Sequence, residues 1–415
     1  MTPNELMIGD LLIIQVLAIT PCLNQNYTAK SLDIFYISPS ELPSRSANAV
    51  HVMHMCDALS KLGHRVTIFG KRSIPSDSDL LETLREAYAV ELANIRLITF
   101  FGGRGRGDNL RIALLALATF LREGEPALIL SRNLYAAFIL AVMFRTSMVF
   151  ETHQVEVGLR KFLQRSIVRQ SHVLTLVISE KLLSALESNI GSLPARSLVL
   201  HDAAPAGIGI IPEESKFALR SAWLAEMGVT APEFMCGYFG HLYAGRGLEI
   251  IQGMAQLRPN VIFLIFGGNE EDIKTRTELN ELSNLKYMGF VNHSKVQKAM
   301  ASMDLLLMPY QAKVSIGVGG HDTAEWMSPM KMFEYMAANV PIVASRLPAL
   351  EEVLVHEVNC LLADPKKVDD WVRCLDRLKA NPSERRILAQ NAYAEYEEEY
   401  NWTARARKML QVVNS

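Results

Sequence analysis

Short apolar runs alternate with amphipathic stretches along most of the chain, beginning near Leu32. Within the runs, apolar residues follow one another without regular polar interruptions, and Gly, Pro or Ser residues bound them. This pattern is typical of parallel strands buried on both faces of a sheet. In the first half the predicted strands are 32–38, 65–70, 95–100, 127–131, 148–152, 173–179 and 197–201, with helices at 47–62 and 109–121.

The alternation pauses at residues 203–212, which are rich in Ala, Gly and Pro, and then starts again. The second series of predicted strands is 234–239, 261–266, 305–309 and one from Ile342, with a helix from Leu248. Such alternation predicts doubly wound α/β domains with parallel sheets. We therefore expect an extension over 1–31, Rossmann-like domains over 32–212 and 213–391, and a C-terminal helix within 392–415 that uses Trp402 as a packing anchor.

One predicted helix, which follows Ser328, carries unusual chemistry. Ser328 is a good N-cap, Pro329 suits the first helical position, and Asn339 can end the helix in the left-handed conformation. Its apolar face holds Met332, Phe333, Met336 and Ala337, whereas Lys331, Glu334, Tyr335 and Ala338 share the opposite face. This spacing predicts a helix that packs one face on the core and offers the other to solvent or a ligand.

Lys331 lies in the first turn, where the helix dipole disfavours a cation by a few tenths of a kcal/mol. An anion bound by the free amides of that turn would reverse the penalty. Glu334, one turn further, offers a carboxylate to a vicinal diol such as that of a ribose. A bound diphosphate with its ribose explains both residues, and an ordinary Lys331–Glu334 surface pair is the alternative.

The segment Ser328-Pro-Met-Lys-Met-Phe-Glu-Tyr-Met-Ala337 resembles the donor-binding motif of GT-B glycosyltransferases, close to family 4, in a Ser-Pro-x-Lys form. The commoner form has two glutamates; Glu334 matches the second, and Trp326 stands at the position of the first. The resemblance implies two domains that face a cleft and a C-terminal helix that crosses back to the N-terminal, acceptor-side domain. It also implies that the second domain binds the nucleotide-sugar.

The loop Gly240-His-Leu-Tyr-Ala-Gly-Arg-Gly247 lacks the Lys and Ser or Thr of a P-loop but resembles the family's diphosphate-binding segment. Arg246 matches its lysine, and His241 stands where relatives have an arginine, so either Lys331 compensates or bound phosphates keep His241 protonated. A plain strand-to-helix turn is the alternative. The resemblance implies donor contacts, beyond Lys331 and Glu334, from Gly240, His241, Arg246, Gly268, Phe290, Val291, Ser328 and Met330.

In the first domain, Glu151-Thr-His153 ends a predicted buried strand, and strand ends line the ligand crevice of such sheets. The resemblance places His153 against the donor sugar, so the implied catalytic residues are His153, Lys331 and Glu334. Arg45, Ser46 and Asn48 open the first helix and are candidates for acceptor or phosphate binding, although Ser46 can equally be a helix cap. His51 and His54 lack a third metal ligand and are interpreted as structural.

Composition and charge limit the kinds of ligand, the cell compartment and the membrane contacts that the chain can have. A net charge of −2 gives no general attraction to nucleic acid, and five dispersed cysteines indicate reduced thiols in the cytoplasm. Asp77-Ser-Asp79 follows no apolar strand, so we expect helix caps there, no metal and no cofactor. The apolar stretch 8–23 has no preceding cation, which argues against a secretory signal, and an interfacial anchor is the alternative. The basic amphipathic stretch 157–169 indicates either a solvated helix or a peripheral contact with the inner membrane surface.

The resemblance implies a retaining, metal-independent hexosyltransferase of GT-B architecture, of the kind used in polysaccharide biosynthesis. It would transfer a sugar from a nucleotide-diphosphate-sugar to a glycan, lipid-linked or small-molecule acceptor. The alternative is a catalytically inactive GT-B-like binding subunit, which Trp326 and His241 favour because both depart from the family pattern.

Overall fold

A computed structural model describes residues 31–75, 80–102, 105, 107–192, 194–205, 211–226, 234–291, 293–313 and 325–414. The expectations for the extension before Ser31, for Asp77–Asp79 and for the middle of the 203–212 linker lie outside these residues. Among the helices that are described, none is both long enough and apolar enough to cross a bilayer.

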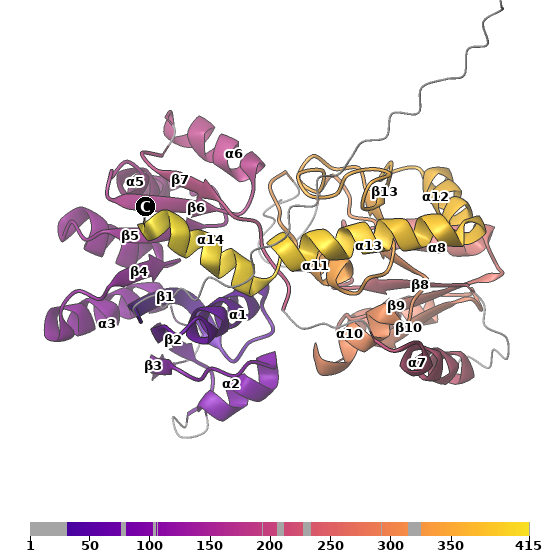
Figure 1. Cartoon of the computed structure of the whole chain (residues 1–415), viewed down its shortest axis with the longest axis horizontal. Coiled ribbons are helices and arrows are strands. Elements are labelled where there is room, and N and C mark those ends of the chain that lie inside the picture. The colour runs from indigo at the N-terminus through magenta and orange to yellow at the C-terminus, as the bar shows by residue number, and fades with distance from the viewer. Residues whose placement is uncertain are drawn as a thin grey trace, which may run out of the picture. The chain divides into compact units, whose positions relative to one another are not determined.

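The amino-terminal half of the described chain contains a seven-stranded sheet with all neighbours parallel. Its order is β3-β2-β1-β4-β5-β6-β7 (Figure 1). The strands are β1 (Asp33–Leu42), β2 (Arg65–Arg72), β3 (Ile95–Phe101), β4 (Leu128–Ser131), β5 (Met148–Thr152), β6 (Val173–Val177) and β7 (Ser197–Val199). Each predicted strand of this half is therefore confirmed, with β1 four residues longer than expected at its end because Glu41 and Leu42 still pair with β2.

Helices cover both faces of this sheet and create two apolar cores. One core lies between the sheet and α1, α2 and α14, and the other lies against α3, η1, α5 and α6. The helices are α1 (Ala47–Lys61), α2 (Leu80–Tyr88), α3 (Asp108–Glu123), α4 (Leu134–Ala137), the π-helix η1 (Phe138–Met143), α5 (Gly158–Val168) and α6 (Glu180–Ile190).

The carboxyl-terminal half repeats the architecture around a six-stranded parallel sheet, again counting described residues. Its order is β10-β9-β8-β11-β12-β13. The strands are β8 (Phe234–Phe239), β9 (Val261–Phe266), β10 (Leu285–Gly289), β11 (Leu305–Met308), β12 (Ile342–Ser345) and β13 (Leu361–Ala363). The helices are α7 (Glu213–Glu226), α8 (Leu248–Leu257), α9 (Glu270–Glu278), α10 (His293–Ala301), α11 (Met330–Ala337), α12 (Val368–Ala380) and α13 (Pro382–Glu399).

The strand orders fix where a ligand is expected in each half. In both sheets the chain starts in the middle, runs to one edge and then returns to fill the other side. The order reverses between β1 and β4 in the first sheet and between β8 and β11 in the second. Ligands of open parallel sheets bind at such reversal points, beyond the carboxyl ends of the strands.

The chain ends in two helices rather than the single helix predicted over 392–413. α13 ends at Glu399 and α14 (Trp402–Asn414) begins three residues later, where the Asn401 side chain accepts a hydrogen bond from the amide of Ala404. α13 packs against α11 and α12 of the second half, whereas α14 packs against α1 of the first (Figure 1). The expected crossing back to the amino-terminal half is therefore confirmed, and Trp402 is buried against His51 and His54.

Candidate active site

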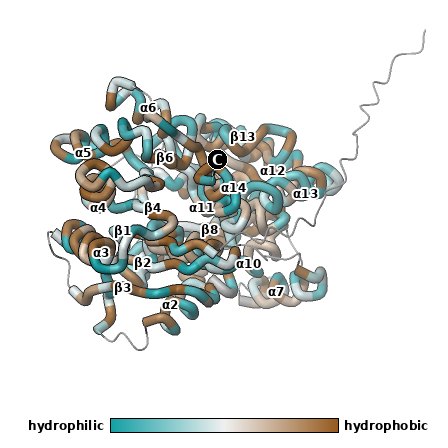
Figure 2. Tube along the Cα trace, turned by 60° about the vertical axis from the view of Figure 1, so that its left-hand side comes forward, coloured by the Kyte–Doolittle hydropathy of each residue, from teal (hydrophilic) through white to brown (hydrophobic). Residues whose placement is uncertain are grey.

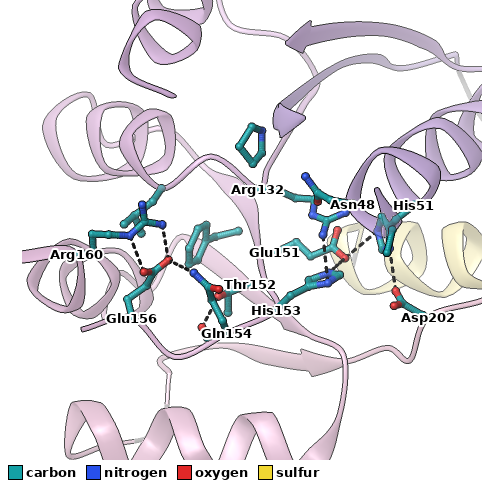
Figure 3. A pocket seen from close by; sticks show the side chains of 14 residues that line it. Asn48, His51, Arg132, Glu151, Thr152, His153, Gln154, Glu156, Arg160 and Asp202 are labelled. Carbon is teal, nitrogen blue, oxygen red and sulfur yellow. Dashed lines mark hydrogen bonds and ion pairs between the residues drawn. The ribbon is translucent and has the colours of Figure 1, made fainter. Parts of the chain in front are cut away.

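A cavity of about 310 Å³ lies at the carboxyl ends of β1, β4 and β5, beside the reversal point of the first sheet. Its lining is mainly polar (Figure 3). His153 follows β5 and Arg132 follows β4, so short buried strands bring together two side chains from distant parts of the chain. The expectation that His153 lies at a strand end in a ligand crevice agrees with this position.

Both ring nitrogens of His153 have protein partners. Nε2 lies 2.9 Å from Oε1 of Glu151, and Nδ1 lies 3.1 Å from Nη2 of Arg132. A carboxylate only accepts and a guanidinium only donates, so this pair of contacts selects the neutral imidazole with its proton on Nε2. Burial lowers the pKa of His153 to about 4, with a further contribution from Arg132, and the ring is neutral at physiological pH.

Glu151 is the centre of a buried charge network at the cavity wall. Its Oε1 accepts a hydrogen bond of 2.9 Å from Arg405 of α14, and the Arg405 side chain is 1% exposed. Burial alone would raise the pKa of Glu151, but His51, Arg405 and Arg132 lower it well below the usual value. The C-terminal helix therefore supplies one of the charges that keep this carboxylate ionised beside His153.

His51 also belongs to this network, although its spacing from His54 predicted only a structural role. Its Nδ1 lies 2.8 Å from Oδ1 of Asp202, its Nε2 lies 3.0 Å from Oε1 of Glu151, and its side chain lines the cavity. His51, Glu151 and His153 offer ligand atoms within 4.8 Å of one another, a spacing compatible with a metal ion. The Arg405 guanidinium contacts the same carboxylate oxygen, so a protein cation already balances the charge of Glu151.

The three candidates in the loop before α1 have separate surroundings. Asn48 lines the cavity, where its Nδ2 donates to Oγ of Ser40 at 2.6 Å. Ser46 is the N-cap of α1 and accepts from the amide of Ala49, which is the capping role that the sequence left open. Arg45 is exposed and lies over the ring of Phe290, 4.4 Å from its centroid. Asn48 alone of these three lines the cavity.

In the second half, helix α11 begins one residue later than the sequence predicts. Pro329 occupies the N-cap position without a side-chain hydrogen bond, and Ser328 does not cap the helix. The Ser328 hydroxyl instead accepts a 2.9 Å hydrogen bond from the backbone amide of Asp202, in the segment after β7. Asn339 has a φ of 53°, as expected for a left-handed helix end.

Lys331 and Glu334 form an ion pair along α11. Nζ of Lys331 lies 2.5 Å from Oε2 of Glu334, and both side chains are largely shielded from solvent. Tyr335 is not on an open face as the helical spacing predicted. It is buried, and its hydroxyl accepts a 2.8 Å hydrogen bond from the amide of Phe239 in β8. In this structure Lys331 and Glu334 therefore make the mutual ion pair that the helical spacing offers as the alternative to ligand contacts.

The loop between β8 and α8 approaches neighbouring backbone closely, at the reversal point of the second sheet. Gly247 has a φ of 73°, and a Cβ atom there would lie 1.8 Å from the carbonyl oxygen of Pro309. A Cβ at Gly267, with a φ of 112°, would lie 2.1 Å from the carbonyl oxygen of Gly240. Glycine is required at both positions, because no side chain fits in that space or that conformation.

A charge at the start of α11 acts on a histidine of this loop. Burial lowers the pKa of His241 below its usual value, and the charges of Arg246 and Lys331 lower it further. The guanidinium of Arg246 lies over the Tyr310 ring, 4.7 Å from its centroid, and its buried Nε has no hydrogen-bond partner among the described residues. Two cations, Arg246 of this loop and Lys331 of α11, therefore lie near a neutral His241.

The remaining donor-side candidates are more dispersed. Phe290 is half exposed, whereas Val291 packs against the core of the second half and Met330 against that of the first. Gly268 follows Gly267 in the turn after β9, also with a positive φ. Trp326, at the position of the missing glutamate, packs against the first half, and its carbonyl accepts a hydrogen bond from Ser179. Position 326 therefore serves the contact between the halves.

Sequence reasoning missed His51, Arg132, Glu151, Asp202 and Arg405 as members of one site. The available signal was polar residues at strand ends, namely Arg132 after β4 and Asp202 after β7, since these ends share one edge of the sheet. No sequence signal indicated Arg405, because its partner Glu151 lies far away along the chain.

Solved structures have the same arrangement of two sheets. The structure of HepE from Anabaena in complex with UDP and glucose has a TM-score of 0.68 at 18% identity, over 92% of this chain and 100% of that chain. Sucrose-phosphate synthase from Thermosynechococcus elongatus has a TM-score of 0.70 at 16% identity over 92% of this chain. The fold is the GT-B fold.

Sequence comparisons find similarity to glycosyltransferases. Residues 247–411 match a family described as glycosyl transferase-like. An uncharacterized glycosyltransferase of Methanocaldococcus jannaschii is 27% identical over 218 residues, which are 49% of this chain and only about half, 52%, of that relative. The GDP-mannose-dependent monoacylated alpha-(1-6)-phosphatidylinositol monomannoside mannosyltransferase of Corynebacterium glutamicum is 25% identical over 328 residues, 72% of this chain and 79% of the relative.

Proposed function

We propose that this protein is a retaining glycosyltransferase that uses a nucleotide-diphosphate-sugar as donor. The observation that carries the proposal is that Arg246, of the β8–α8 loop, and Lys331, in the first turn of α11, both lie near His241 at the reversal point of the second sheet. Their position in a GT-B fold, next to the tight glycine contacts of the β8–α8 loop, supports a diphosphate site. HepE, a structural neighbour, was solved with UDP and glucose.

In this proposal the second domain, 213–391, holds the donor and the first, 32–212, holds the acceptor. Arg246, Lys331 and the amides at the start of α11 bind the diphosphate, and Glu334 binds the ribose. The same cations stabilise the negative charge that develops on the departing diphosphate. We also propose that the transfer needs no metal ion, that the protein belongs to family 4, and that it acts at the cytoplasmic side of the membrane.

His153 is proposed to orient the donor sugar across the cleft. Both of its ring nitrogens have partners, so a sugar hydroxyl would have to replace the Arg132 contact at Nδ1. Glu151 would hold the ring through this exchange, because its own contact is to Nε2. The acceptor remains a glycan, a lipid-linked sugar or a small molecule, and the C. glutamicum relative is named for a lipid-linked acceptor.

The test combines nucleotide binding with donor turnover. A thermal-shift screen with UDP, GDP and ADP identifies the base, and hydrolysis or transfer is then measured for Lys331→Ala and Glu334→Gln. We expect each substitution to reduce turnover by about tenfold or more, since each removes a charged contact to the donor worth about 1.5–3 kcal/mol. The control is the exposed pair Lys274 and Glu278 on α9, whose 3.9 Å contact makes Lys274→Ala and Glu278→Gln comparable surface changes.

Unchanged turnover in both α11 variants, with donor still bound, would refute the proposed site. A protein that binds nucleotide-sugar but never turns it over would instead support the inactive binding subunit. One observation favours that second function: Trp326 packs against the first half, so position 326 provides no carboxylate to the donor.

A further inference from the structure

Three neighbouring elements of the amino-terminal half expose large apolar side chains. They are α3, the end of η1, and α5 with the residue that precedes it, and both α3 and α5 contact η1. The rings of Phe120 on α3 and Phe144 after η1 lie 6.0 Å apart, which ties the two elements together. We call this surface the α3–α5 face; its exposed apolar residues are Leu110, Leu114, Leu121, Met143, Phe144, Val157, Leu159 and Phe162. Figure 2 shows brown, apolar stretches on α3 and α5 on the same side of the molecule.

Helix α5 presents two large apolar side chains, those of Leu159 and Phe162, away from the protein. Its buried positions are Gln164, Ile167 and Val168. At 100° per residue Leu159 and Phe162 lie on the opposite side of the helix, where they are 77% and 60% exposed. A helix that only packs against its own sheet would have polar residues there, so the outward side of α5 is suited to an apolar partner.

Around η1 and α5 the charge of the α3–α5 face is positive, whereas α3 carries Asp108 and Glu123 as well as Arg111 and Arg122. Residues 138–150 and 157–172 contain no Asp or Glu, but they contain Arg145, Arg160, Lys161, Arg165 and Arg169. Arg160 pairs with Glu156. For the other four cations, no ion pair occurs within the described residues. On α5, Arg165 and Arg169 lie on one side of the direction in which Phe162 points, within about 60° of it around the helix.

We propose that the α3–α5 face docks onto the surface of an anionic phospholipid bilayer. Leu159, Phe162 and the apolar residues of α3 and η1 insert among the acyl chains near the headgroups, while the cations contact lipid phosphates. A second copy of this chain would place Arg165 and Arg169 of one protomer against those of the other, an arrangement that like charges oppose. The combination of apolar centre and unpaired cations therefore fits a lipid surface.

The docked surface adjoins the candidate acceptor cavity. The cavity is lined by Arg160, in the first turn of α5, and by Glu156, just before α5 (Figure 3). Val157 and Leu159, which lie next to these residues in the sequence, are exposed. A protein docked through α5 would hold the cavity at headgroup level. This geometry favours a lipid-linked acceptor, an extension that depends on the proposed function, whereas the docking itself does not.

The test is sedimentation of the full chain with lipid vesicles. Vesicles of phosphatidylcholine alone are compared with vesicles that also contain phosphatidylglycerol. We expect binding to the anionic vesicles only, and weaker binding as salt is added, because the cations are exposed to solvent. Equal binding to both vesicle types, or none to either, would overturn the proposal.

Two double variants assign the binding to the α3–α5 face. Leu159→Ser with Phe162→Ser is expected to weaken vesicle binding by about tenfold or more, through lost apolar burial. Arg165→Gln with Arg169→Gln is expected to weaken it by about fivefold per cation removed. The control is Phe217→Ser with Leu279→Ser, since these side chains are 67% and 74% exposed on the other half and should not contribute.

Unchanged vesicle binding in both α5 variants would overturn the proposal. Nucleotide thermal shift and donor turnover without lipid are measured on the same variants and are expected to match the wild type. Failure of vesicle binding with normal turnover refutes the docking surface alone. Normal docking without turnover refutes the enzyme alone.

Discussion

His241 lies beside two cations, and this placement makes donor binding depend on pH. Burial, Arg246 and Lys331 keep its pKa below the usual value in the free protein, so the ring is neutral at pH 7. A diphosphate bound by the same residues would raise that pKa. Binding then takes up a proton at any pH between the two pKa values, and affinity rises as the pH falls through this window.

We expect a nucleotide-sugar to bind about three- to tenfold more tightly at pH 6 than at pH 8, since one proton linked over one pH unit is worth up to about 1.4 kcal/mol. The diester diphosphate of such a donor does not titrate in this range. Calorimetry across the range measures the change, and His241→Gln should flatten it. A wild-type profile that coincides with that of His241→Gln would exclude a role for this ring.

Single-residue roles were predicted well only where local sequence determines them. The left-handed Asn339 and the cap at Ser46 follow from short-range rules that the structure satisfies. Ser328 fits the same rules, yet its hydroxyl bonds to the amide of Asp202, because tertiary contact overrides the local preference. His51 was underestimated for a related reason: its carboxylate partners come from two distant strand ends.

At the scale of elements, α14 is both a structural cover and a part of the cavity network. Arg405 is buried and makes hydrogen bonds to Glu151 and to the carbonyl oxygen of His201. Arg405→Met would leave Glu151 as a buried charge without this partner. The expected cost is about 3–5 kcal/mol in the free energy of unfolding.

A lowered melting temperature of Arg405→Met, measured by calorimetry, checks this prediction. Adding Glu151→Gln to the variant should restore part of the loss, because the carboxylate charge is then gone. Arg407→Met is the matched control, since Arg407 is exposed on the same helix. Equal melting temperatures for the two single variants would show that the Arg405 contact contributes little.

Elements were predictable where hydrophobic pattern alone decides them. The run Val261–Phe266 is entirely buried as β9, and every other predicted strand has its counterpart. The break between α13 and α14 was missed because residues 392–413 keep a helical pattern across it. The turn forms there since the two helices pack on different halves of the molecule, which no local window can show.

At the scale of the whole molecule, Glu352 links the two halves through a helix end. Its carboxylate accepts hydrogen bonds of 2.8 and 2.9 Å from the amides of Glu180 and Lys181, the first residues of α6. A carboxylate at this position accepts hydrogen bonds from the free amides and interacts favourably with the positive end of the helix dipole. This single side chain of the second half thus caps a helix of the first.

We expect Glu352→Ala to increase hydrogen exchange at the amides of Glu180 and Lys181 by about tenfold, as loss of a cap costs about 1 kcal/mol or somewhat more. Exchange measured by mass spectrometry checks this result. Glu351→Ala serves as control, because Glu351 is paired with Arg346 within its own half. Protection unaltered by Glu352→Ala would mean that the two halves separate readily at this contact in solution.

The return of α14 to the first sheet also constrains how the chain is made. Amino-terminal domains usually fold first during synthesis. Here, one apolar face of the first sheet is completed by Trp402, Ala406 and Met409, which are synthesised after the whole of the second sheet. Until then the nascent half has an uncovered face, and Glu151 lacks Arg405. We therefore expect the first domain to be completed only after the second sheet has been made, and to depend on chaperones before that.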